Sequence, residues 1–125
     1  MEKTPSEKFD ASINRILKRY ADDLSENVDQ IAISLGRRGA NELRAGSAID
    51  FGGTGKYARG WTSTVEQKRT GAIVTIHNAN VPGLPHLLEH GHANRGGGRT
   101  PGRYHIGYVE QLIAEAFERE VVSKL

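Results

Sequence analysis

The first third of the chain carries an apolar stripe with the spacing of an α-helix. Its apolar residues recur almost always at steps of three or four, as one face of a helix requires, at Phe9, Ile13, Ile16, Leu17, Tyr20, Leu24, Val28, Ile31 and Leu35. Thr4 stands as the N-cap, Pro5 as the first helical residue and Glu7 as the carboxylate of a capping box. The pattern therefore predicts a long amphipathic helix at the N-terminus.

The predicted helix is too long for one small domain to cover. From Pro5 to Leu35 it would extend about 46 Å, which exceeds the width of a globule of this size. We therefore expect either a kink or burial of part of the stripe against another subunit. Gly36 and Gly39 are expected to weaken the end of the helix, although Ala40, Leu43 and Arg44 are suited to one or two further turns.

An alternation of apolar and polar residues replaces the helical spacing in the middle of the chain. After a glycine-rich loop over residues 45–56, alternation predicts a strand whose one face holds Tyr57, Arg59, Trp61, Ser63 and Val65. A turn over residues 67–71 leads into a β-branched run over residues 72–78. The two segments together predict an antiparallel hairpin.

The rest of the chain is predicted as a short helix, a loop and a longer helix. Residues 84–91 have room for two helical turns, residues 94–103 form a flexible loop, and residues 104–106 offer a short strand. Apolar residues at helical spacing predict a last helix from about residue 107 to residue 123. The expected fold class is α+β, in the order α-β-β-α-(β)-α, with an antiparallel sheet built on the hairpin. We expect a single domain over residues 1–125, made of a long N-terminal helix (1–44), a sheet with a short helix and a basic glycine-rich loop (45–106), and a C-terminal helix (107–125).

Composition excludes several classes of protein. The chain has no cysteine, so disulfides, thiolate metal sites and cysteine nucleophiles are excluded. No apolar run approaches the roughly 20 residues of a membrane span, and the first residues lack the basic start and apolar stretch of a signal peptide. We therefore expect a soluble, cytosolic protein without a membrane partner. Aromatic residues make up only 6% of the chain, which predicts a modest core that needs a partner for full stability.

Glycine and positive charge are concentrated in the middle of the chain. All fifteen glycines lie between Gly36 and Gly107, and residues 36–105 carry ten Lys or Arg against four Asp or Glu. Both properties coincide in the predicted loop, at Arg95, Arg99 and Arg103. These arginines are suited to contacting phosphates or to ordering against a neighbouring subunit, and a plain solvated loop is the third alternative. A free-standing nucleic-acid-binding protein is accordingly one hypothesis for the function.

One short motif suggests metal chemistry. His86-Leu87-Leu88-Glu89-His90 matches H-x-x-E-H, in which two histidines one helical turn apart hold zinc and the glutamate activates water. A third ligand, such as His105, has to come from beyond the motif. A zinc-dependent hydrolase or nuclease with His86, His90 and His105 as ligands is therefore an alternative hypothesis. It stands beside a structural zinc site and beside histidines with a structural or interfacial role.

The order of the motifs resembles a known protein family. Thr54-Gly55-Lys56-Tyr57-Ala58-Arg59-Gly60-Trp61 leads into the predicted hairpin, and Leu87-Leu88-Glu89-His90-Gly91-His92-Ala93 leads into the arginine loop. From about residue 40 to the C-terminus, this order is similar to the small tail-completion, or head–tail joining, proteins of long-tailed bacteriophages and prophages.

The resemblance implies a structural, non-enzymatic protein of the virion. Family members are neck and tail-end components, so it implies a homo-oligomeric ring, expected to be a hexamer, at the head–tail interface after assembly in the host cytoplasm. The implied partners are neck proteins and tail-tube or tail-terminator proteins, with non-specific contact to DNA in transit. It implies no cofactor and no catalytic residue. The residues expected at the assembly interface are Tyr57, Trp61, His92, Arg95, Arg99 and Arg103.

Overall fold

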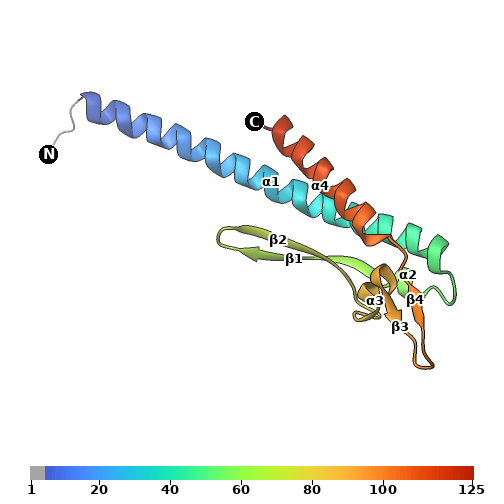
Figure 1. The fold of residues 1–125 in the computed structure, drawn as a ribbon. Coiled ribbons are helices and arrows are strands. Elements are labelled where there is room, and N and C mark those ends of the chain that lie inside the picture. Colours follow the sequence, from blue (N-terminus) through green and yellow to red (C-terminus); the bar gives the residue numbers. More distant parts are fainter. Residues whose placement is uncertain (1–4) are drawn as a thin grey trace.

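A computed structural model describes residues 5–125 of the chain, with their side chains from residue 13 onward (Figure 1). Helices and strands are mixed in the α+β arrangement that the sequence predicted. No described helix is both long and apolar enough to cross a membrane. The elements, in chain order, are α1 (Pro5–Phe51), α2 (Lys56–Arg59), β1 (Trp61–Lys68), β2 (Gly71–Asn78), α3 (Leu84–His90), β3 (Gly91–Ala93), β4 (Arg99–Pro101) and α4 (Ile106–Ser123).

The long helix α1 contacts most of the other elements of the molecule. The β1–β2 hairpin lies against it, and α4 runs back along it in the opposite direction (Figure 1). The short α3 and the β3–β4 hairpin lie near the C-terminal end of α1. β1 pairs with β2 in antiparallel register, from Trp61 opposite Asn78 to Lys68 opposite Gly71. β3 pairs only with β4, so the expected single sheet is in fact two separate hairpins.

α1 is longer than the sequence predicted. It continues without a break to Phe51, so the prediction of a loop from residue 45 was wrong for the first seven residues of that loop. Tertiary contacts hold these extra turns in place. The buried hydroxyl of Ser47 accepts a hydrogen bond from the indole N–H of Trp61 at 3.1 Å, and Phe51 packs edge-on against Tyr57. These contacts outweigh the low helix propensity of the glycine in this stretch.

Gly36 and Gly39 lie inside α1 and do not weaken its end. A Cβ atom at Gly36 would collide with Cγ1 of Val74, and a Cβ atom at Gly39 would lie 2.5 Å from Cδ1 of Ile76. The two glycines therefore allow β2 to approach the helix more closely than any side chain would permit. Their role is to pack the hairpin onto α1, and the prediction that they weaken the helix was wrong.

Three shorter segments also differ from the prediction. Residues 57–59, expected in a strand, form the turn of α2, because the consecutive Tyr57 and Ala58 are both buried and an alternating strand would expose one of them. The expected loop over 94–103 is partly a hairpin, because β4 pairs with β3. In the described chain, residues 104–106 contain no strand, and the last of them begins α4. The expected capping box lies outside the side chains that the structure describes.

The core is divided into two small clusters along α1. In the first cluster, Ile31 and Leu35 pack against Ala116 of α4. In the second, Leu43 packs against Tyr57 and Trp61. The apolar side chains around both clusters are only half-buried, which leaves the core incompletely covered; they include Ile76, Ile106, Val109, Ile113 and Phe117.

Candidate functional site

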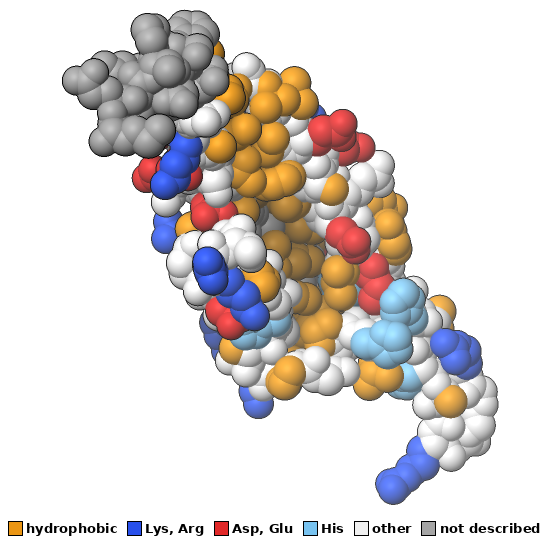
Figure 2. Space-filling view, turned by 90° about the vertical axis from the view of Figure 1, so that its left-hand side faces the viewer, with side chains coloured by type: hydrophobic (Ala, Val, Ile, Leu, Met, Phe, Trp, Pro, Cys, Tyr) orange, Lys and Arg blue, Asp and Glu red, His pale blue; other side chains and the backbone are white. Residues whose placement is uncertain are grey.

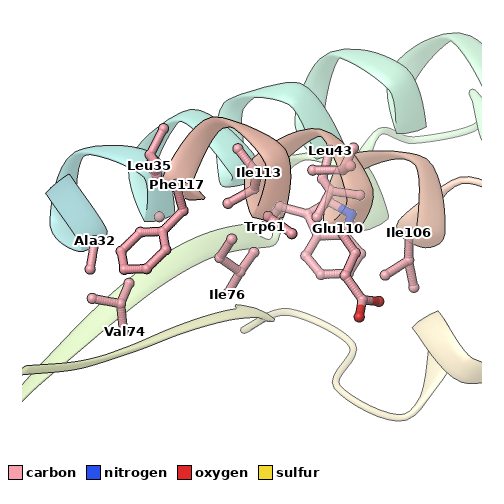
Figure 3. Close-up of a pocket in the computed structure, with 13 residues that line it drawn as sticks. Ala32, Leu35, Leu43, Trp61, Val74, Ile76, Ile106, Glu110, Ile113 and Phe117 are labelled. Carbon is pink, nitrogen blue, oxygen red and sulfur yellow. The ribbon is translucent and has the colours of Figure 1, made fainter. Parts of the chain in front are cut away.

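An apolar groove opens between the β1–β2 hairpin and α4, where the core is incompletely covered (Figure 2). It has a volume of about 440 Å³. α1, β2 and α4 all contribute to its lining, as Figure 3 shows. Glu110 is the one charged residue among the described residues that line it. The apolar lining includes Ala32, Leu35, Leu43, Trp61, Val74, Ile76, Ile106, Ile113, Ala114 and Phe117.

The N-terminal part of α1 projects beyond the rest of the molecule (Figure 1). Asp29 of α1 is hydrogen-bonded to the β1–β2 hairpin: its carboxylate accepts a hydrogen bond from the backbone N–H of Ala72 at 3.0 Å. Before this point, every described side chain from residue 13 to residue 23 is exposed. The large apolar residues of this segment form what we call the α1 stripe: Ile13, Ile16, Leu17 and Tyr20.

Glu89 joins α3 to the first turn of α4. Its Oε1 accepts hydrogen bonds from the backbone N–H groups of His105 at 2.7 Å and Ile106 at 2.9 Å, and its Oε2 accepts one from Gly107 at 2.9 Å. A helix N-terminus has unsatisfied donors and favours negative charge. Burial alone would raise the pKa of Glu89, but the three backbone N–H groups and the adjacent His105 hold that pKa below its usual value of 4.5. Glu89 is therefore a buried carboxylate that caps α4.

His105 and Tyr57 extend this polar network into the core. His105 Nδ1 donates a hydrogen bond to the backbone carbonyl of Arg103 at 2.6 Å and lies 2.9 Å from Oε1 of Glu89. With its proton on Nδ1, His105 accepts a hydrogen bond at Nε2 from the Tyr57 hydroxyl at 2.6 Å. Burial, together with the charge of Glu89, raises the pKa of Tyr57 to about 12. The hydrogen bonds of Tyr57, His105 and Glu89 thereby connect α2, α3 and the start of α4.

The H-x-x-E-H motif does not gather a set of metal ligands. His86 and His90 lie one turn apart on α3, with ring centroids 4.9 Å apart, and both are exposed. Glu89 instead caps α4, and His105 is bound to Tyr57. Within the described part of the chain, no group of three or more His, Asp or Glu side chains is placed to hold a metal ion. The geometry therefore lends no support to the zinc hypothesis.

The three arginines of the expected loop are exposed, and two of them are engaged. Arg99 donates a hydrogen bond to the backbone carbonyl of His90 at 3.1 Å. Arg103 donates one to the backbone carbonyl of Asp50, also at 3.1 Å, and lies 3.8 Å from its carboxylate. These contacts attach the hairpin region to α3 and to the end of α1. Arg95, near the turn, has no hydrogen-bond or ion-pair partner among the described residues.

The structure separates the residues that the sequence placed at an interface. Tyr57 and Trp61 are buried in the core, where Trp61 also lines the groove. His92 is half-buried on β3 and donates a hydrogen bond to the carbonyl of Ala93 at 3.3 Å. Sequence reasoning missed the groove, because α1, β1, β2 and α4 all contribute to its lining and come from different parts of the chain. Two signals in the sequence pointed to an uncovered apolar surface: the excess length of the first helix and the low aromatic content, 6%.

A comparison of the chain with protein-family models, with curated proteins and with solved structures finds no significant match.

Proposed function

We propose that this chain is a structural, non-enzymatic protein of the head–tail interface of a long-tailed bacteriophage. It acts by assembling with copies of itself into a ring, which docks onto neck components and onto tail-tube or tail-terminator components. The order of the motifs along the chain suggests this family. The folded chain adds a physical reason for self-association, and the proposal requires no cofactor.

The observation that carries the proposal is the exposure of the α1 stripe. Ile16 is 68% exposed, Leu17 is 60% exposed and Tyr20 is 55% exposed. Fully burying one large apolar side chain stabilises a protein by about 1.5–3 kcal/mol. In the described chain nothing covers these residues, so a second molecule is needed to gain that stabilisation. Grouped apolar exposure of this kind marks an interaction surface.

The shape of the chain suits the subunit of a ring. α1 has 47 residues and is therefore about 70 Å long, so it carries the stripe well away from the core of its own chain. Arg95 lies toward the other end of the molecule, in the β3–β4 hairpin. One subunit thus presents an apolar contact at one end and a basic contact at the other. The basic end is suited to an acidic surface of a neighbouring protein or to DNA that passes through a ring.

Measurement of the oligomeric state tests this proposal. Light scattering and electron microscopy are applied to the purified chain over a range of concentrations, alone and with the neck and tail-tube components of the same phage. We expect oligomers that grow with concentration, or rings that form when the partners are added. A strict monomer under all of these conditions overturns the proposal.

A further inference from the structure

The groove between the β1–β2 hairpin and α4 is not filled by any of the residues that the structure describes. Residues that line it, such as Val74 and Ile113, are only half-buried. The α1 stripe of the same molecule cannot reach the groove, because both lie on one continuous helix. Tyr20, at the end of the stripe, is twelve residues from Ala32, at the start of the groove, which is about 18 Å along the helix. An α1 stripe that fills the groove therefore has to come from another molecule.

The groove and the stripe have matching lengths. The residues that line the groove run from Ala32 to Leu43 along α1 and from Ile106 to Phe117 along α4. Each of these spans is about 16 Å, at 1.5 Å per helical residue. The stripe, continued to the half-buried Leu24, has the same length. An apolar face on a helix, laid into an apolar groove, is a common mode of recognition between proteins.

The charges beside the two surfaces are complementary. α4 carries four glutamates and one arginine, and one of these glutamates, Glu110, lines the groove. Acidic side chains are visible beside the apolar groove in Figure 2. By contrast, the segment from Ile13 to Leu24 carries three basic residues, including Lys18 and Arg19, against two acidic ones, Asp22 and Asp23, and so has a net charge of +1. A helix with this charge is attracted to the α4 side of the groove, which favours the α1 segment over an acidic partner.

We infer that the groove of each subunit receives the α1 stripe of a second copy of the same chain. This inference rests on the proposed function and specifies the contact that joins the subunits. The stripe and the groove are different surfaces, so the contact is heterologous and passes from one subunit to the next. Each groove is complete only when a neighbour supplies Ile13, Ile16, Leu17 and Tyr20.

Cross-linking tests the contact directly, because the chain has no cysteine of its own. Leu17→Cys is mixed with Ala114→Cys, which lies on the exposed rim of the groove, and Ile16→Cys is mixed with Ala32→Cys to sample a second register. The control partner is Ile49→Cys, which is 85% exposed on α1 and does not line the groove. We expect at least one stripe–groove pair to form disulfide-linked dimers about tenfold faster than the control, because an interface raises the effective concentration of the thiols.

A mixing experiment provides a second readout that does not depend on the register. The double variant Ile16→Glu/Leu17→Glu keeps the groove and loses the stripe, whereas Ala114→Arg keeps the stripe and obstructs the groove. All three positions are exposed, so both variants retain the fold, which circular dichroism verifies. Each variant alone is expected to be a monomer by native mass spectrometry. The mixture is expected to form a one-to-one dimer, because one intact stripe and one intact groove remain.

The outcomes separate this inference from the proposed function. Oligomers that form without any stripe–groove cross-link, and that persist in both variants, overturn the inference and leave the proposed function standing. A cross-linked pair that never builds a ring and never binds neck or tail components supports the inference and overturns the proposed function. A wild-type chain that stays monomeric in every mixture overturns both.

Discussion

The hydroxyl of Tyr57 and the Nε2 atom of His105 lie 2.6 Å apart in the core of the protein. Tyr57 belongs to α2 and His105 precedes α4, so this hydrogen bond joins segments that are 48 residues apart. Because Nδ1 of the same ring contacts Glu89, the two residues connect α2 to α3 as well. A buried network of this kind positions the elements around the groove, and its titration properties can be measured.

We expect Tyr57 to ionise at a higher pH than an ordinary tyrosine side chain. Burial and the charge of Glu89 raise its pKa from 10.0 to about 12. Since the folded value lies above the unfolded value, the stabilisation is present below pH 10 and is lost as the pH rises toward 12. Ultraviolet titration at 295 nm should show one late tyrosine, and Tyr57→Phe should remove it. A late tyrosine that survives in Tyr57→Phe would contradict the assignment.

Glu89→Gln should destabilise the protein and weaken its response to acid. The carboxylate accepts three backbone hydrogen bonds, and hydrogen bonds to a charged group contribute about 1.5–3 kcal/mol each. We expect the free energy of unfolding in urea to fall by about 3 kcal/mol, because an amide turns one N–H group toward these donors.

The direction of the pH effect follows from the lowered pKa of Glu89. The stabilisation is present above the usual value of 4.5 and is lost as the pH falls through the lower folded value. Wild-type stability should therefore decline more steeply below pH 4.5 than that of Glu89→Gln. Equal acid sensitivity of the two proteins would show that another group is responsible.

Gly36→Ala and Gly46→Ala should change stability in opposite directions, although both glycines lie in α1. A methyl group at Gly36 collides with Val74, whereas a methyl group at Gly46 meets nothing within 4 Å. We expect Gly36→Ala to lower the free energy of unfolding by about 1–3 kcal/mol through overpacking. Gly46→Ala should raise it by about 1 kcal/mol through helix propensity. Urea unfolding of the two variants checks this, and a gain in stability for Gly36→Ala would refute the close packing.

Replacing Arg95, Arg99 and Arg103 with alanine should preserve the fold and impair assembly. Their side chains are exposed, and surface ion pairs such as Arg103–Asp50 contribute about 0–1 kcal/mol. Circular dichroism should therefore be unchanged, whereas the yield of infectious particles should fall. The triple lysine variant is the control, because it keeps the charge. A normal yield from the alanine variant would show that these arginines do not contribute to assembly.

Sequence patterns predicted those elements that a local pattern specifies, such as a β-branched run or helical spacing of apolar residues. The β-branched run of β2, the short helix α3 and the amphipathic α4 were each found close to their observed bounds. The last turns of α1 were missed, because they depend on the contact between Ser47 and Trp61, which are distant in the chain. An element was therefore predicted when local contacts stabilise it, and it was missed when a distant residue stabilises it.

The role of Glu89 could not be predicted either, because its partners are distant in the chain. Its position between two histidines is typical of a zinc peptidase, yet its carboxylate binds backbone groups sixteen to eighteen residues away. No local pattern specifies that contact. The α1 stripe, by contrast, was predictable from the spacing of Ile13, Ile16, Leu17 and Tyr20. The length of the helix left two alternatives, a kink or an uncovered stripe, and the uninterrupted α1 has the uncovered stripe.

Sedimentation over a range of concentrations shows whether the α1 stripe drives self-association. Three chains are compared: the wild type, Ile16→Glu/Leu17→Glu, and the control Ile49→Glu, which introduces a charge at a still more exposed isoleucine outside the stripe. We expect the wild type and Ile49→Glu to associate as the concentration rises, and the double variant to stay monomeric. Association of the double variant with the same concentration dependence as the wild type would contradict this expectation.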